Sequence, residues 1–247
     1  MTSSTFLDAW LRRYREVPRA RARLVCFPYA GGGATVFRLW PSGLPLDVEV
    51  IAIQYPGRQD RYDEPVIDEM AAMVEPIRAA LDRLPARPTV LFGHSMGASI
   101  AYETSLRLAV PPRLLVVSGH NAPHRAARKP VPRTEDEVIA EVRAVDGPHE
   151  TLADPELREL VMPALHGDYR LIRGYLPAAG PRPVPVPIVA YTGTLDPTAQ
   201  PEQVRAWAEL CTGDFELVSF PGGHFFLESH TGEVLADLSG RLTDAVR

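Results

Sequence analysis

Short runs of apolar residues alternate with segments of helical periodicity along most of the chain. The apolar runs are each long enough for one buried strand, and they occupy residues 23–27, 48–54, 90–92, 113–119, 188–192 and 215–220. Segments with apolar residues at helical spacing lie between and after them, at residues 66–84, 98–101, 202–210 and 234–242. Repeated alternation of this kind is typical of right-handed crossovers, so it predicts an α/β fold with a mostly parallel central sheet flanked by helices.

The alternation is interrupted between residues 120 and 178. Residues 134–137 form a capping box there, and Asp154 followed by Pro155 predicts the start of a further helix. Pro163 lies inside that helix and predicts a kink or a break. We expect residues 120–178 to form a helical lid insertion near the carboxyl edge of the sheet; the alternative is a covering subdomain with no gating role.

The sequence Gly93-His94-Ser95-Met96-Gly97 joins an apolar run to a helical segment. A G-x-S-x-G pattern between a strand and a helix is the context of a nucleophile elbow, whose tight turn projects the serine hydroxyl above the sheet. The N-terminus of the helix directs free N–H groups to the same point. The pattern predicts Ser95 as a nucleophile; the alternative is a glycine-flanked turn with an inert serine.

Two further polar residues follow predicted strands. Asp196 comes after the run at 188–192, and His224 comes after the run at 215–220. The order Ser95, Asp196, His224 resembles that of the catalytic triad in the α/β-hydrolase fold. His224 would accept the serine proton and Asp196 would orient the imidazole. His120 also follows a strand, and we expect it either to line the substrate pocket or to be exposed.

An oxyanion formed during acyl transfer needs preorganised hydrogen-bond donors. The N–H of Met96, directly after the predicted nucleophile, is one candidate. The glycine-rich loop after the first apolar run supplies the other, which is the N–H of Ala30 or, as the alternative, that of its neighbour Tyr29. We also expect Tyr29 to bind the substrate. That loop lacks the patterns of nucleotide-binding loops, and the alternative is that its glycines serve only a turn.

Composition narrows the range of functions. A chain of 247 residues with 45% hydrophobic residues can bury one large core, so we expect one domain over residues 1–247. The net charge of −5 gives no reason to expect nucleic acid, and no apolar run approaches the roughly 18 residues of a membrane span. The start lacks a signal-peptide pattern and the two cysteines lie far apart, which favours the cytoplasm. The cysteines and histidines show no metal-ligand spacing, so we expect no metal site.

Several segments together resemble the type II thioesterases, the stand-alone editing enzymes of polyketide and nonribosomal peptide synthases. They are Phe27-Pro-Tyr-Ala-Gly-Gly32, Gln54-Tyr-Pro-Gly-Arg58, Phe92-Gly-His-Ser-Met-Gly97, Ser118-Gly119 with Ala122-Pro123, Gly193 with Asp196-Pro197, and Pro221-Gly-Gly-His-Phe-Phe226. The resemblance implies an α/β-hydrolase fold with Ser95, Asp196 and His224 as the triad, and Met96 and Ala30 as oxyanion donors. The chain departs from the family at residues 166–169, where His-Gly-Asp-Tyr replaces a frequent Arg-Ala-Asp before an aromatic residue.

The resemblance also implies the substrate. Type II thioesterases hydrolyse acyl groups from the phosphopantetheine arm of acyl or peptidyl carrier proteins, so the arm belongs to the partner and no bound cofactor is expected. A chain-releasing thioesterase or a small-ester hydrolase remains an alternative, as does a non-catalytic protein that only binds the synthase. We expect a monomer.

Two stretches are rich in basic residues. Residues 12–23 carry six arginines and are expected to form a solvated segment over the body of the protein. Arg125, Arg128, Lys129 and Arg133 lie at the start of the predicted lid. They are either an attractive surface for an acidic carrier protein or a solvated loop.

Overall fold

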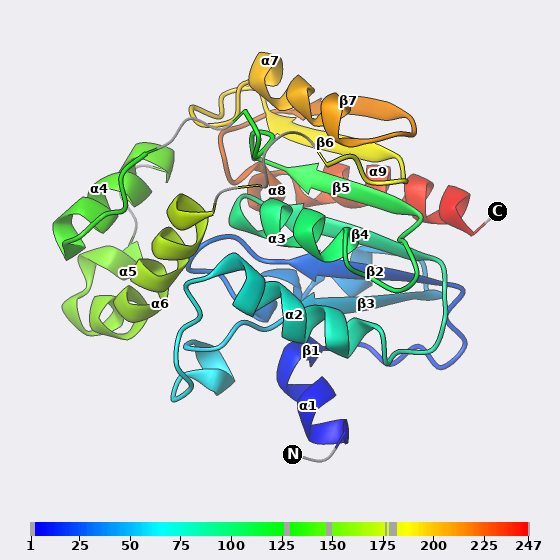
Figure 1. Cartoon of the computed structure of the whole chain (residues 1–247), viewed down its shortest axis with the longest axis horizontal. Helices are drawn as coiled ribbons and strands as arrows, with labels where there is room; N and C mark the ends of the chain where they lie inside the picture. Colours follow the sequence, from blue (N-terminus) through cyan, green and yellow to red (C-terminus); the bar gives the residue numbers. More distant parts are fainter. Residues whose placement is uncertain (1–2, 126–128, 147–149, 176, 178–181, 247) are drawn as a thin grey trace.

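A seven-stranded sheet forms the centre of the protein (Figure 1). The computed structural model describes residues 3–125, 129–146, 150–175, 177 and 182–246. The strand order is β1-β3-β2-β4-β5-β6-β7, and all neighbours are parallel except β1 and β3. The strands are β1 Leu11–Arg12, β2 Ala22–Phe27, β3 Val48–Ile53, β4 Thr89–His94, β5 Leu114–Ser118, β6 Ile188–Gly193 and β7 Phe215–Phe220. The predicted fold class is confirmed.

Helices cover both faces of this sheet, because its inner strands carry apolar residues on both sides. Along β2, Val25 and Phe27 pack into one core and Leu24 and Cys26 into the other. The first core includes α2 Met70–Leu81 and α3 Met96–Ser105, and the second includes α9 Thr231–Ala245. The remaining helices outside residues 120–178 are α1 Ser3–Trp10, η1 Ala34–Phe37, η2 Trp40–Gly43, η3 Gln59–Arg61, α7 Pro201–Val204, η4 Arg205–Leu210 and α8 Phe226–Ser229.

The N-terminal segment is more closely attached than its arginines suggested. Leu11 and Arg12 form the antiparallel edge strand β1 against β3. The Arg15 guanidinium donates to the carbonyl oxygens of Pro45, at 2.9 Å, and of Pro41. Arg23 is buried and pairs with Glu49 at 2.8 Å. The expectation of a solvated segment was therefore wrong for these residues.

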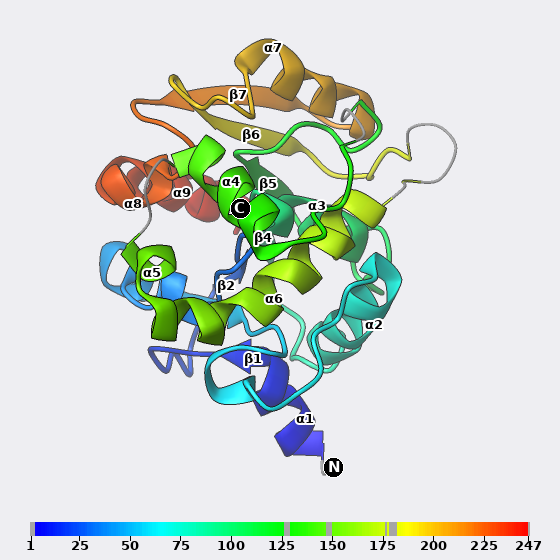
Figure 2. The ribbon, with the colours of Figure 1, turned by 90° about the vertical axis from the view of Figure 1, so that its left-hand side faces the viewer.

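Three helices lie between β5 and β6, within the described part of residues 120–178: α4 Glu135–Asp146, α5 Glu150–Ala153 and α6 Pro155–Gly174. Figure 2 shows them in front of the carboxyl ends of the strands. Both predicted N-termini are confirmed, since the Thr134 hydroxyl accepts from the N–H of Glu137, and Asp154 accepts from the first turn of α6. The helix α6 continues through Pro163, so the predicted break does not occur. Pro163 has no N–H to donate to the carbonyl of Glu159, four residues earlier. Both residues are exposed, so water can bind that carbonyl instead.

The end of this insertion is fixed to the elbow helix by a buried carboxylate. Glu103 of α3 accepts hydrogen bonds from the hydroxyl of Tyr175, directly after α6, and from Arg182 at 2.5 Å. Arg107 completes the cluster. Because Glu103 has three donors around it, its pKa lies below the ordinary value even though burial alone would raise it.

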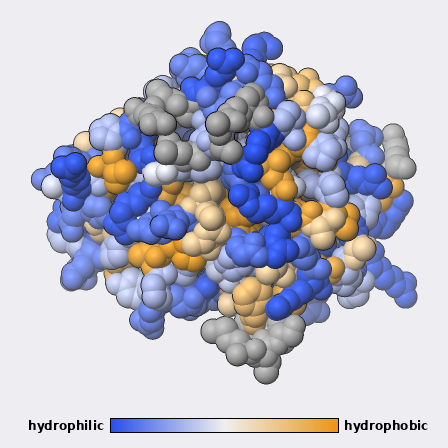
Figure 3. Space-filling model, in the orientation of Figure 1, coloured by the Kyte–Doolittle hydropathy of each residue, from blue (hydrophilic) through white to orange (hydrophobic). Residues whose placement is uncertain are grey.

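The surface in Figure 3 is mostly hydrophilic, and its hydrophobic side chains form separate patches. Among the residues that the structure describes, no helix combines the length and the hydrophobicity that crossing a membrane requires.

Candidate active site

Ser95 lies at a sharp turn between β4 and α3, with φ 52° and ψ −121°. Only one other described residue that is not glycine has a positive φ, Gln59. The turn is possible because Gly93 and Gly97 lack side chains: an added Cβ would lie 2.2 Å from the Gly97 carbonyl oxygen in the first case and 2.1 Å from that of Phe27 in the second. Strained backbone of this kind is typical of functional sites, and it exposes the serine at the carboxyl edge of the sheet.

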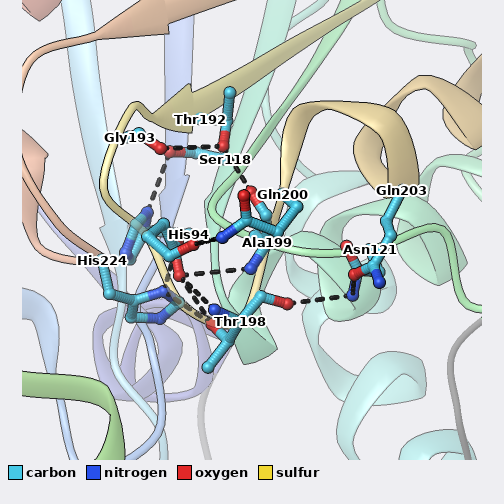
Figure 4. Close-up of polar contacts among 11 residues, drawn as sticks. His94, Ser118, Asn121, Thr192, Gly193, Thr198, Ala199, Gln200, Gln203 and His224 are labelled. Atoms are coloured by element: carbon cyan, nitrogen blue, oxygen red, sulfur yellow. Dashed lines mark hydrogen bonds and ion pairs between the residues drawn. The ribbon is translucent and has the colours of Figure 1, made fainter.

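Asp196 and His224 meet at the same edge. Their loops follow β6 and β7, and Nδ1 of His224 lies 2.7 Å from Oδ2 of Asp196. Figure 4 shows His224 with Thr198 and Ala199 of the loop after β6. The second carboxylate oxygen, Oδ1, accepts from the N–H of Thr198 at 2.8 Å and from the N–H of Ala199 at 3.2 Å. An Nδ1–H that donates to a carboxylate leaves Nε2 of the imidazole free to accept a proton.

Thr198 is a site residue that the sequence did not reveal. Its hydroxyl donates to Oδ1 of Asp196 at 2.8 Å and lies 3.2 Å from Nδ1 of His224. Burial by itself raises the pKa of Asp196, but the bonds from His224 and Thr198 lower it below the ordinary value. The carboxylate therefore stays ionised at neutral pH.

His94 lies beside this pair without joining it. Its Nδ1 contacts the Ser118 hydroxyl at 2.8 Å, and its ring centroid is 5.0 Å from that of His224. Complete burial, and next the charge of His224, lower the pKa of His94 well below its ordinary value. We therefore interpret this neutral, buried imidazole as a packing residue beside the site.

The glycine-rich loop that carries Tyr29 and Ala30 is bound to the turn at residues 54–58. The amide oxygen of Gln54 accepts the N–H of Ala34 at 2.9 Å. The Tyr55 hydroxyl donates to the Pro28 carbonyl at 3.2 Å. Two of the sequence segments that carry the resemblance, at residues 27–32 and 54–58, therefore contact each other directly.

A cavity of about 350 Å³ connects these parts, as far as the described residues delimit it. Ser95, His224, Tyr29 and Ala30 line one side. The other side consists of apolar residues from α4, α5 and α6, namely Val142, Val145, Leu152, Val161 and Leu165. The Tyr29 hydroxyl donates to Glu228 at 2.6 Å, which fixes the tyrosine ring at the wall.

His120 does not line this cavity, so its placement does not support the predicted substrate contact. Its carbonyl accepts from the indole of Trp207 at 2.8 Å. Burial and then the charge of His224 lower its pKa to about 4. Within the described ranges, no three His, Cys, Asp or Glu side chains are grouped as metal ligands would be.

One member of the predicted basic cluster at residues 125–133 is engaged in an ion pair. Arg125 pairs with Glu209 at 3.0 Å, whereas Lys129 and Arg133 line an open groove beside α4 and α6. Arg128 lies outside the described residues.

Comparison with known proteins shows which family the chain is similar to. The model of the thioesterase domain family matches residues 22–242. A probable cadicidin biosynthesis thioesterase of Streptomyces griseus is 38% identical over 238 residues, which are 94% of this chain and 66% of that protein. Thioesterase PikA5 of Streptomyces venezuelae is 38% identical over 240 residues, which are 94% of this chain and 85% of that protein.

A solved structure, the type II thioesterase BorB from the borrelidin biosynthetic cluster, has the same fold. Its TM-score is 0.84 at 35% identity, and the match covers 96% of this chain and 97% of BorB. The matched length and the shared fold lead to one assignment: the chain belongs to the thioesterase family.

Proposed function

We propose that the protein is a serine thioesterase that removes acyl groups from the phosphopantetheine arm of carrier proteins. The observation that carries the proposal is the shared cavity, in which Ser95, His224 and Ala30 face an apolar wall from the insertion helices. A thioester carbonyl at Ser95 would place its acyl chain against that wall and its thiol toward the surface.

In the proposed reaction, Oγ of Ser95 attacks the thioester carbonyl carbon while Nε2 of His224 takes the hydroxyl proton. The N–H groups of Met96 and Ala30 stabilise the oxyanion. The carbon–sulfur bond then breaks, and His224 returns the proton to the departing thiolate. Water attacks the acyl-serine with His224 again as base, which releases a carboxylic acid and restores Ser95. Asp196 keeps the imidazole oriented and stabilises its positive charge.

The relatives support the editing role within this reaction class. BorB is a type II thioesterase from a biosynthetic cluster, and the Streptomyces griseus protein is named for cadicidin biosynthesis. We infer that this chain clears misprimed or stalled acyl groups from acyl or peptidyl carrier proteins. It would act in the cytoplasm, as a monomer and without a bound cofactor.

Ser95→Ala tests the serine mechanism. The variant should lose hydrolysis of acyl-carrier protein almost completely, and wild-type protein should accumulate an acyl group on Ser95 that mass spectrometry detects. Unchanged hydrolysis in the variant would exclude the mechanism.

The editing role needs a separate comparison. Release rates are measured for one acyl group on a carrier protein, on a free pantetheine analogue and as a simple ester. Preference for the carrier is expected, whereas equal turnover of all three would favour a small-ester hydrolase. Comparison of short priming units with a full-length chain then separates editing from chain release.

A further inference from the structure

Asp168 of α6 is completely buried against the loop that carries Ala30. Its Oδ2 accepts the N–H of Gly31 at 2.7 Å and Nη1 of Arg58 at 2.6 Å. Its Oδ1 accepts Nη2 of Arg58 at 2.8 Å. One carboxylate of the insertion therefore receives three N–H donors from two segments of the body.

Arg58 contacts the same loop directly as well as through Asp168. Its Nη1 also donates to the carbonyl oxygen of Gly32 at 3.2 Å. The N–H of Gly31 and the carbonyl of Gly32 thus both have charged partners, which are bonded to each other. Charged hydrogen bonds with two parallel N–H groups are the strongest and the most directional in proteins.

The backbone between these contacts has little freedom to move. Gly31 has φ +79°, and a Cβ on it would lie 2.7 Å from Cδ2 of Leu165, one turn before Asp168. The helix α6 therefore packs directly on the loop through an apolar side chain as well as through the carboxylate. Neither Asp168 nor Arg58 lines the cavity.

The hydrogen bond between Asp168 and Gly31 lies next to the proposed oxyanion donor. The peptide that carries the Gly31 N–H follows directly after Ala30, whose own N–H is the proposed oxyanion donor. We propose that Asp168 is a positioning residue, which acts through Arg58 and Gly31 to aim the Ala30 N–H at the oxyanion. This inference rests on the proposed serine mechanism. It makes the oxyanion site dependent on the same helix that supplies Val161 and Leu165 to the acyl wall.

Asp168→Asn provides the first test. Asparagine has one oxygen for three donors, so its amide NH₂ must face Gly31 or Arg58 and lose that bond. The readouts are kcat and KM for a small pantetheine thioester, and the rate at which a fluorophosphonate labels Ser95, because its phosphoryl oxygen occupies an oxyanion position. We expect kcat and the labelling rate to fall roughly ten- to hundredfold per active site, with KM changed less than threefold.

Two further variants separate positioning from stability. Asp68→Asn is the matched control, because Asp68 also joins the body to α6, through Arg170 at 2.8 Å, but on the exposed surface and without a part in the bonds to Gly31 and Gly32. It should label at the wild-type rate. Arg58→Met combined with Asp168→Leu removes both buried charges, so this double variant should fold even where Asp168→Asn does not. It still lacks the partners of Gly31 and Gly32 and should remain slow.

Wild-type labelling in the folded double variant would overturn the proposal, and so would an equal loss in Asp68→Asn. Fluorophosphonate labelling needs neither a carrier protein nor a particular acyl group. If the editing role is wrong, the expected differences in labelling rate between the variants and the wild type still hold. If the serine mechanism is wrong, the wild-type protein itself is not labelled.

Discussion

The hydroxyl of Thr198 lies 2.8 Å from Oδ1 of Asp196 and thereby completes the set of donors around that carboxylate. The same hydroxyl is 3.2 Å from Nδ1 of His224, so it contacts both members of the pair. Asp196 is thus bound on one oxygen by its own loop and on the other by the imidazole. Because the loop holds Oδ1 of Asp196, it also fixes the position of Oδ2. The loop thereby determines the orientation of the His224 ring, which is bonded to Oδ2.

Thr198→Val should lower kcat roughly tenfold, because a hydrogen bond to a charged group contributes about 1.5–3 kcal/mol and only part of it concerns orientation. KM should change little, since Thr198 does not line the cavity. Steady-state hydrolysis of acyl-carrier protein measures both quantities. Thr198→Ser keeps the hydroxyl and should retain most of the activity; equal loss in both variants would assign the effect to packing.

Ala30→Pro removes the N–H that we propose as the second oxyanion donor. Turnover should fall by roughly two to three orders of magnitude, the usual effect of losing one such donor. Ala30→Gly retains the N–H and is the matched control. Wild-type turnover in a folded Ala30→Pro protein, judged by circular dichroism, would place the donor elsewhere.

Val161→Phe should shorten the acyl chains that the enzyme accepts, because Val161 lines the apolar wall of the cavity. The ratio of kcat/KM for octanoyl over acetyl groups, loaded on the same carrier protein, should fall tenfold or more, since each methylene contributes about 1–3 kcal/mol to discrimination. The adjacent Leu160 is exposed and does not line the cavity. Leu160→Phe should therefore keep the wild-type ratio, and a similar shift in both variants would contradict the assignment of the wall.

His120 predicts a pH dependence of stability. Its pKa in the folded protein is about 4, whereas an unfolded imidazole titrates near its ordinary value of 6.5. Between these values the unfolded state binds more protons, so His120 contributes a loss of stability as the pH falls from 6.5 to 4. His120→Gln should reduce this loss by roughly 1–3 kcal/mol, measured by urea unfolding at pH 7 and at pH 4.5. Equal losses in both proteins would show that His120 does not titrate in this way.

Much of the fold was predictable because its signals are local. Buried strands with flanking turns, the glycines at 93 and 97, and the capping residues of α4 and α6 each act within a few positions of the sequence. Asp196 and His224 were predictable together because the carboxyl ends of parallel strands meet at one edge.

The contacts that were not predicted depend on distant partners. The edge strand β1 has two residues and no apolar run of its own, so only its pairing with β3 defines it. Asp168 follows no strand, and its partner Arg58 is 110 positions away. His120 follows a strand, but its side chain lies outside the cavity, a direction that the sequence pattern does not determine.

The cluster around Glu103 has a consequence for exchanging insertions between relatives. Residues 120–178 are joined to the body near their end by the hydroxyl of Tyr175 on Glu103, at the opposite end of the helix that begins after Ser95. A foreign insertion that ends in a residue without this donor would leave a buried carboxylate on the nucleophile's own helix short of a partner. Recombination points placed after Arg182 carry Tyr175 and Arg182 with the insertion, while Arg107 stays in the body, and chimeras for altered acyl preference are best designed with that boundary.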